Sequence, residues 1–270
     1  KVISAASIVI LVAACSESSG GGGGEDDRQT VAPEVARTGS DSRVSFRYDP
    51  DQPSGPVVWR RGPSGTFLLT QAFDEVTITG MPDGFNSYYV DRLSKPYHIL
   101  RGLTPSGQGE IFLEPGSTTG MTDSTTVLSR LGETTLPDSG MVTYTGTYAG
   151  LYSVVGQPET AGHMFGRAQL ELDFASNTLS GLIDQRANSG GQAATDITLE
   201  LGAMADGSFS GTTTGGAFAS GYSSAPGTYG GLIVGQNGEE AIGQATVYHN
   251  GATDYVETGG FIVGVCNPNC

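Results

Sequence analysis

The carboxy-terminal half of the chain alternates between apolar and polar residues with a period of two. Between Ala168 and Phe174 every second side chain is apolar, and the alternation recurs in Val142–Tyr148 and Ile197–Leu201. This period places one face of a segment in a core and the other in solvent, as in a half-buried β-strand. The pattern predicts eight strands, at about 141–149, 164–175, 178–185, 195–202, 206–214, 227–235, 239–249 and 254–265.

Turn-forming residues separate these segments. They are Asn177, Asp206-Gly207, Asn237-Gly238 and Asn250-Gly251. Such residues favour tight hairpins because Asn, Asp and Gly tolerate positive φ. Eight antiparallel strands joined in sequence can close into a small barrel, which leaves no unpaired edge. We therefore predict an eight-stranded antiparallel β-barrel over residues 136–270, and we expect this part to fold alone because a closed barrel has its own core.

Residues 41–135 show shorter strand-like runs between Pro- and Gly-containing turn clusters. The runs predict strands at Val44–Tyr48, Val57–Arg61, Thr66–Leu69, Val76–Thr79, Tyr88–Arg92, Tyr97–Leu100 and Glu110–Leu113. Ser124–Leu131 is predicted to be a short helix, with Asp123 as its N-cap and Gly132 after its end. The fold class is therefore all-β, with a small N-terminal β-rich domain followed by the barrel.

The amino terminus has the pattern of a lipoprotein signal. Lys1 precedes a short apolar stretch, Val2–Ala14, which suits a signal peptide and is too short to span a bilayer. The stretch ends in Val12-Ala13-Ala14-Cys15, which resembles the bacterial lipobox. We predict a signal peptide over residues 1–14 and a lipid anchor on Cys15. The alternative is an ordinary secretory signal followed by a chance cysteine.

The segment after Cys15 contains almost no apolar residues. Ser16-Glu-Ser-Ser is followed by five glycines and then by Glu25-Asp-Asp27. Gly/Ser chains behave as flexible coils, and neighbouring like charges extend them. We predict a disordered tether over residues 15–40 that holds the folded part off a membrane. Ser16 stands where an aspartate would signal inner-membrane retention in some bacteria, so we expect the outer membrane.

Charge divides the chain into two regions. Residues 131–270 contain 13 carboxylates but two basic residues, Arg167 and Arg186, a net charge of −11 out of −15 for the whole chain. Binding to nucleic acid needs clustered Lys and Arg that contact the phosphate backbone. The composition therefore excludes a nucleic-acid partner.

No arrangement of residues in the sequence matches a catalytic or metal site. His98, His163 and His249 lie in different regions, without Cys or carboxylates at the spacing of metal ligands. The sequence around His163 and His249 predicts that both are exposed. Gly207-Ser-Phe-Ser-Gly211 has Phe209 where a nucleophilic serine would stand. We expect no catalytic residue, no metal and no cofactor.

Cys266 and Cys270 remain as an even pair once Cys15 carries a lipid. Exported proteins fold in oxidising compartments, and the Asn-Pro-Asn sequence between the two cysteines can bring the thiols together. We predict a disulfide that fixes the end of the chain, in preference to a redox or metal site.

Several short motifs lie at the predicted strands of the barrel. They are Leu136-Pro-Asp-Ser-Gly140, Thr143-Tyr-Thr-Gly-Thr-Tyr148, Leu170-Glu-Leu-Asp-Phe174, Leu179-Ser-Gly181, Gly230-Gly-Leu232 and Glu239-Glu-Ala-Ile-Gly243. Together they resemble the barrel domain of transferrin-binding protein B and related surface lipoproteins of Gram-negative bacteria, over about residues 136–265. The chain departs from that family at Leu232-Ile-Val234, which replaces an aromatic pair. The resemblance implies a surface lipoprotein with a handle domain before the barrel, and it does not carry over transferrin as the ligand.

Trp, Tyr and Arg are concentrated in the middle region. Trp59, Arg60 and Arg61 are consecutive, and Tyr88 and Tyr89 lie on another predicted strand, further along the chain. These residue types dominate protein interfaces because they combine large apolar area with directed hydrogen bonds. We predict that these five residues contact a protein partner. The alternative is that Trp59 belongs to the core and the arginines only favour solubility.

The features together predict a tethered, non-enzymatic lipoprotein that binds an extracellular or host protein, or an iron-bearing ligand. Two alternatives stay open. One is a structural lipoprotein of the envelope with no specific ligand. The other is an integral outer-membrane barrel. The missing aromatic girdles and the presence of a tether both argue against it.

Overall fold

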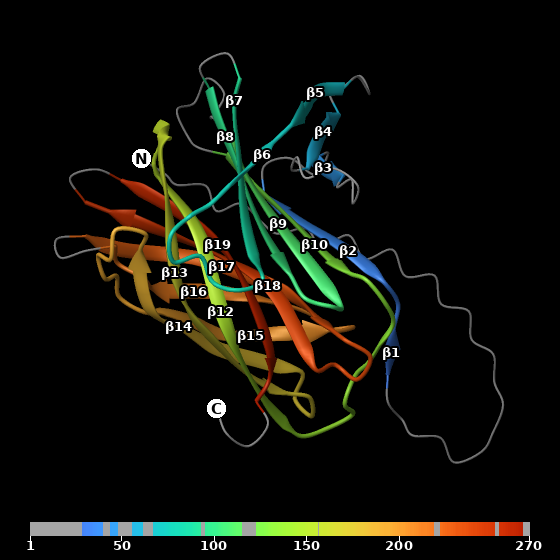
Figure 1. Ribbon diagram of the computed structural model, residues 1–270. Coiled ribbons are helices and arrows are strands. Elements are labelled where there is room, and N and C mark those ends of the chain that lie inside the picture. The colour runs from blue at the N-terminus through green and yellow to red at the C-terminus, as the bar shows by residue number, and fades with distance from the viewer. Residues whose placement is uncertain are drawn as a thin grey trace.

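The computed structural model describes residues 29–39, 44–47, 56–61, 67–92, 95–114, 123–155, 157–218, 222–251 and 254–266. Every regular element within these ranges is a β-strand (Figure 1). Within these ranges no helix is long and apolar enough to cross a membrane. The predicted all-β class is confirmed.

Eight consecutive strands close into an antiparallel barrel, in which the last strand pairs with the first. They are β12 (Met141–Val154), β13 (Gln157–Asp173), β14 (Thr178–Asn188), β15 (Ile197–Ala205), β16 (Ser208–Gly215), β17 (Ser223–Val234), β18 (Glu240–Asn250) and β19 (Tyr255–Val265). Each predicted strand overlaps one of these. The turn between β15 and β16 also matches, since Asp206 and Gly207 both have positive φ, at 50° and 71°.

Large side chains from around the barrel fill its interior. Tyr144, Tyr148, Phe209, Tyr229 and Phe261 are each at most 2% exposed. The Tyr144 hydroxyl donates to the carbonyl of Gly238 at 2.5 Å, and the Tyr229 hydroxyl donates to the carbonyl of Glu200 at 2.6 Å. Burial of these rings therefore leaves neither hydroxyl without a partner, and the interior is a packed core.

The N-terminal region forms a six-stranded sheet that lies against the outside of the barrel (Figure 1). In spatial order its strands are β2 (Glu34–Gly39), β10 (Asp123–Arg130), β9 (Gly107–Glu114), β8 (Lys95–Leu103), β7 (Phe85–Arg92) and β6 (Asp74–Val76). On one face, Leu100 and Ile111 pack with Leu151 of the barrel, and Leu128 packs with Ile242. This apolar core is shared by the sheet and the barrel.

The other face of the six-stranded sheet packs against a three-stranded sheet. Its strands are β3 (Val44–Arg47), β4 (Val57–Arg61) and β5 (Phe67–Ala72). Val44 and Val58 from this layer meet Ile99 and Phe112 of the larger sheet. The N-terminal region is therefore a two-layer β structure placed on the barrel wall.

The predicted helix over Ser124–Leu131 is wrong. Asp123–Arg130 is β10, which pairs with β9 on one side and β2 on the other. Its side chains alternate between the two faces of the sheet, so that Val127 and Leu128 are both buried, on opposite sides. Pairing with two neighbours outweighs the local capping signal, because strand preference depends strongly on context.

The disordered tether predicted over residues 15–40 includes residues that are in fact folded. Residues 30–31 and 34–39 form the strands β1 (Thr30–Val31) and β2. The polar composition of this segment hid its strands, which are stabilised by pairing with β11 (Thr134–Thr135) and β10. The signal peptide and residues 15–28 of the tether lie outside the described residues.

The β1–β11 pair covers one end of the barrel, which we call the closed end. Val31 and Leu136 pack into the core of the barrel there. Arg130, at the end of β10, donates to the carbonyls of Ile233 at 2.8 Å and Ala32 at 2.9 Å. We call the opposite end, where β12, β14, β16 and β18 end and β13, β15, β17 and β19 begin, the distal end.

Candidate functional site

The residues predicted to contact a partner do not form one surface. Trp59, Arg60 and Arg61 lie on β4, but their side chains are outside the described part of the structure. Tyr88 and Tyr89 point to opposite faces of the sheet, as neighbours on a strand do. Tyr88 is 6% exposed and packs in the core between the two sheets, so its predicted role as a contact residue is wrong for the folded protein. Tyr89 is partly exposed, with its ring 5.0 Å from that of His98.

The expected exposure of His163 and His249 is also wrong. His163 is 8% exposed and His249 is fully buried. His163 lies on the outer wall of the barrel, where its Nε2 is 2.9 Å from the Ser87 hydroxyl of the N-terminal sheet. Burial lowers the pKa of His163 to about 4, and burial together with the charge of His163 lowers the pKa of His98 to about 4. Both histidines are therefore neutral at pH 7.

The carboxy-terminal cysteine pair is described in part. Cys266 is disulfide-bonded, and its amide donates to the carbonyl of Thr143 at 2.8 Å. This contact fixes the chain end beside β12 at the closed end. Cys270, its predicted partner, and Cys15, the predicted lipidation site, lie outside the described residues.

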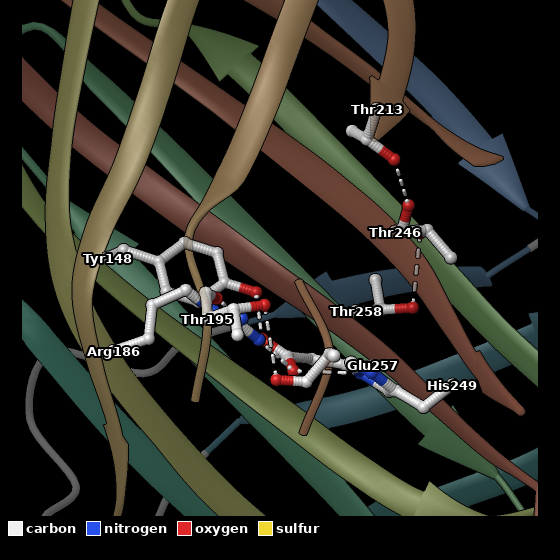
Figure 2. A network of polar contacts seen from close by, with 9 residues as sticks. Tyr148, Arg186, Thr195, Thr213, Thr246, His249, Glu257 and Thr258 are labelled. Atoms are coloured by element: carbon white, nitrogen blue, oxygen red, sulfur yellow. Dashed lines mark hydrogen bonds and ion pairs between the residues drawn. The ribbon is translucent and has the colours of Figure 1, made fainter. Parts of the chain in front are cut away.

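A buried polar network lies inside the barrel near the distal end (Figure 2). At its centre is Glu257 of β19, whose Oε2 is 2.5 Å from Nη2 of Arg186 on β14. The Tyr148 hydroxyl of β12 donates to Oε1 of Glu257 at 2.7 Å, and Nε2 of His249 on β18 lies 3.3 Å from Oε2. Each of the four side chains is at most 1% exposed. One carboxylate thus joins four strands of the barrel.

Further polar contacts extend this network. Arg186 also donates to the carbonyl of Thr195, at the distal end. Beside the network, the Thr213 hydroxyl of β16 donates to the carbonyl of Thr246 on β18 at 2.9 Å, and the Thr246 hydroxyl is 3.2 Å from the Thr258 hydroxyl of β19 (Figure 2). These bonds satisfy polar groups that burial has removed from water.

Arg186 points into the barrel because β14 contains a β-bulge. Phe165 pairs with Ala187 and Arg167 pairs with Asp184, so Gly166 lies opposite two residues, Gln185 and Arg186. Gln185 has a φ of 53°, in the left-handed region. The extra residue reverses the alternation along the strand, which turns Arg186 inward.

Gly166 is needed opposite the bulge. A Cβ at this position would lie 2.9 Å from the carbonyl oxygen of Asp184 and 3.0 Å from Cγ of Arg186. The missing side chain therefore lets the bulged strand and the arginine stem approach β13 closely.

Electrostatics keep the central pair of the network ionised. Burial alone would raise the pKa of Glu257, but the Arg186 charge and the contacts from His249 outweigh burial and hold that pKa well below its usual value. Burial and the Glu257 charge raise the pKa of Tyr148, which stays a hydrogen-bond donor. The Glu257 carboxylate therefore stays bound to its partners, and the network links the strands of the barrel. Within the described residues no group of three or more His, Cys, Asp or Glu could hold a metal ion.

Aromatic side chains from separate segments gather over this network at the distal end. The Phe218 ring has its centroid 4.7 Å from that of Tyr152, 5.3 Å from Tyr255 and 6.2 Å from Tyr222. It also meets the His249 ring at 6.0 Å, which links the aromatic residues to the network. Phe218 is buried, whereas the three tyrosines are partly exposed. We call Tyr152, Phe218, Tyr222 and Tyr255 the distal aromatic cluster.

Neither arginine of the barrel presents a free cation. Arg186 is buried against Glu257, and Arg167 forms two hydrogen bonds with Asp184, at 2.6 and 3.0 Å. Many carboxylates are exposed, among them Asp196 and Asp254 at the distal end. The described barrel surface is therefore acidic, with no unpaired Lys or Arg.

The fold has similar counterparts among solved structures. No family model and no curated protein matches the chain. Intact Ap-TbpB, with its N and C lobes, is 13% identical with a TM-score of 0.44, over 87% of this chain and 46% of that chain. Transferrin binding protein B from serogroup B Neisseria meningitidis is 15% identical with a TM-score of 0.44, over 87% of this chain and 44% of that one.

A second kind of similar structure has no assigned activity. A protein of unknown function from the DUF3598 family of Nostoc punctiforme is 10% identical with a TM-score of 0.33, over 88% of this chain and 94% of that chain. By contrast, the chain spans less than half the length of the two transferrin-binding proteins. The eight-stranded barrel described above rests on the strand pairing of this chain itself.

The sequence did not predict either the buried network around Glu257 or the distal aromatic cluster. No prediction was made for the side chain of Arg186, because the bulge at Gln185 that turns it inward has no sequence signature such as glycine. One signal was present, since Arg186 is one of two basic residues in a strongly acidic half of the chain, and a rare charge of this kind often has a buried partner. The members of the distal aromatic cluster are up to about 100 residues apart, and closure of the barrel brings them together.

Proposed function

We propose that the protein is a lipoprotein, anchored to the outer membrane through Cys15, that binds an extracellular protein at the cell surface and catalyses no reaction. The observation that supports this most is where the tether meets the fold. Gln29 lies at the closed end of the barrel, since its carbonyl accepts from the amide of Leu136 at 2.8 Å and its amide side chain donates to Asp206 at 2.6 Å. The anchor therefore joins one end of the barrel and leaves the other free for recognition.

The dimensions agree with this arrangement. Fourteen residues separate Cys15 from Gln29 in the sequence, enough to span at most about 50 Å. The 14 residues of β12 extend a further length of roughly 45 Å along the strand toward the distal end. The distal end is thus the part of the barrel farthest from the attachment point.

The packed interior favours a partner bound on the outside. The barrel is filled by its own side chains, so recognition falls to the distal end and to the N-terminal sheets, where Trp59, Arg60 and Arg61 are predicted contacts. The sequence resemblance to transferrin-binding-protein-B-like surface lipoproteins supports a protein as the ligand. It does not specify which protein.

Anchoring is tested by Cys15→Ser. We expect this variant to leave the membrane fraction, because it lacks the sulfur that carries the lipid, whereas Cys266→Ser stays membrane-bound. Membrane association that is unchanged in Cys15→Ser would overturn the anchor.

Surface exposure and binding need separate measurements. Protease added to intact cells should degrade the wild-type protein, and residues 16–270, which lack the anchoring Cys15, should capture a protein from host serum or culture fluid. Protection in intact cells combined with cleavage in lysed cells would instead indicate a lipoprotein that faces the periplasm.

A further inference from the structure

We propose that the distal aromatic cluster binds arginine side chains of a basic segment in a partner protein. The proposal rests on the proposed function, because it names the chemistry of the protein that is bound. It concerns Tyr152, Tyr222 and Tyr255, whose rings are partly exposed around the buried Phe218.

The arrangement of the rings suits a planar cation. Phe218 and Tyr255 are parallel within 3°, whereas Tyr222 is turned by 72° from Tyr255 at a centroid distance of 5.6 Å. Tyr152 meets Tyr255 at 6.3 Å and 62°. Aromatic faces attract a cation held within about 6 Å, and a guanidinium group can also stack on them. A cluster that presents rings in several orientations can contact a guanidinium on more than one side.

The cluster is held in place before any partner arrives. Tyr222 lies against the backbone of Gly251, where an added Cβ would be 2.6 Å from the ring. Phe218 rests on His249, which is joined to Glu257 and through it to Arg186. Binding to preorganised side chains loses less conformational entropy than binding to mobile ones.

Charge decides which kind of partner fits. Asp254 is exposed beside Tyr255, and the described barrel surface offers no unpaired Lys or Arg that would repel a basic segment. The negative potential of residues 131–270, with a net charge of −11, attracts basic partners and speeds their association. Arginine fits better than lysine, because the guanidinium is planar and more weakly hydrated than an ammonium group.

The test uses residues 16–270, which lack the anchoring Cys15, and three labelled peptides of equal length: oligo-arginine, oligo-lysine and oligo-glutamate. Fluorescence anisotropy at about 150 mM salt, where long-range attraction between exposed charges is largely screened, measures their affinities. We expect oligo-arginine to bind several-fold more tightly than oligo-lysine, and oligo-glutamate not to bind.

Variants of the cluster separate the aromatic faces from the hydroxyls. Tyr222→Leu with Tyr255→Leu should weaken oligo-arginine binding about tenfold, because two cation–aromatic contacts are lost. Tyr222→Phe with Tyr255→Phe keeps the ring faces and should stay within about threefold of wild type. Tyr248→Leu is the matched control: Tyr248 is 40% exposed on β18 and lies outside the cluster, so its loss should leave the affinity unchanged.

Three results would overturn the proposal. The first is unchanged affinity in the double leucine variant, and the second is an equal loss of affinity in Tyr248→Leu. The third is that arginine and lysine peptides bind equally well and that salt abolishes their binding to the same extent in every variant. The last of these would mean unspecific attraction to an acidic surface. A cooperative melt checks that each variant is folded. If the double leucine variant does not fold, Tyr255→Leu alone should still weaken binding about threefold, and an unchanged affinity in it would also overturn the proposal.

Failure of the proposed function has a different outcome. Peptide binding that depends on the cluster, without capture of any protein from host serum or culture fluid, would reject the proposed function alone. Capture of a protein that the double leucine variant binds as tightly as wild type would reject the cluster as its site and leave the proposed function standing.

Discussion

The barrel and the N-terminal sheets consist of the same kind of strand but complete their cores in different ways. Every barrel strand pairs with two neighbours, and the interior is filled by the barrel's own residues together with Val31 and Leu136. The six-stranded sheet ends at β2 and β6, and one of its faces is buried only by the wall of the barrel. The barrel is thus a nearly self-sufficient body, and the N-terminal region depends on it.

The two regions also differ in charge. Eleven of the 13 Lys and Arg residues precede residue 131, and the two in the barrel are neutralised by ion pairs. The N-terminal region can therefore supply cationic contacts to a partner, whereas the barrel can accept them.

Separating the regions should have the largest effect. Residues 29–135 expressed alone should not fold, because the face that carries Leu100, Ile111 and Leu128 loses its cover. Residues 136–270 should still melt cooperatively, at a lower temperature than the full chain, since Val31 is missing and the outer wall is uncovered. Circular dichroism melts of the three proteins measure both effects. A cooperative melt of residues 29–135 alone would contradict the dependence described here.

Breaking the buried pair should come next. Arg186→Met leaves the Glu257 charge inside the barrel without its partner, which should lower the free energy of unfolding by about 3–5 kcal/mol. Urea denaturation measures this loss.

The same comparison contains its own control. Arg167→Met removes the exposed pair with Asp184 and should change stability little, because water screens such pairs. Replacing both Arg186 and Glu257 by Met should cost less than either single change, since no unpaired charge remains. Equal losses for Arg186→Met and Arg167→Met would contradict a structural role for the network.

Acid should loosen the contact between the two regions. His98 and His163 have pKa values of about 4 in the folded protein, below the usual value of 6.5. The unfolded chain therefore takes up protons first, and stability falls as the pH drops from about 6.5 toward 4. At pH 5 each histidine should cost up to about 2 kcal/mol relative to pH 8. His163→Gln keeps a neutral partner for Ser87 and should flatten the pH dependence measured by urea denaturation.

Glu110 on β9 acts with the opposite sign. Burial raises its pKa to about 7 from 4.5, so its contribution to stability is present below pH 4.5 and is lost as the pH rises through 7. Glu110→Gln should stabilise the protein by about 1–2 kcal/mol at pH 8 and make the loss on acidification steeper. A pH profile that is identical in Glu110→Gln and wild type would show that this carboxyl group does not titrate in that range.

The smallest expected effect concerns the bulge. Gln185 adopts a φ of 53°, which costs a residue with a Cβ about 1 kcal/mol. Gln185→Gly should recover about that amount in urea denaturation, whereas Gln185→Ala should not. Lower stability in the glycine variant would mean that the glutamine side chain, rather than the backbone, holds the bulge.

The sequence predicted the elements better than it predicted their contacts. Alternation located all eight barrel strands, because each buries one face in a common core. It failed at Asp123–Arg130, a strand with partners on both sides, where capping residues suggested a helix. The expected exposure of His163 was wrong because a covering sheet buries that side chain, and no local pattern indicated that a bulge would bury Arg186.

The strand pair at the closed end has a mechanical consequence. If Cys15 carries the proposed anchor and a partner binds, a pull between the two enters the fold at Gln29 and is carried first by β1. That strand is held by two residues of pairing with β11, by Val31 in the barrel core, and by the bonds of Gln29 and Ala32 with Leu136, Asp206 and Arg130. The many hydrogen bonds between the barrel strands come under force only after this short strand pair has separated. Under tension the β1–β11 pair should separate first, which would lengthen the tether by a few residues while the barrel stays intact.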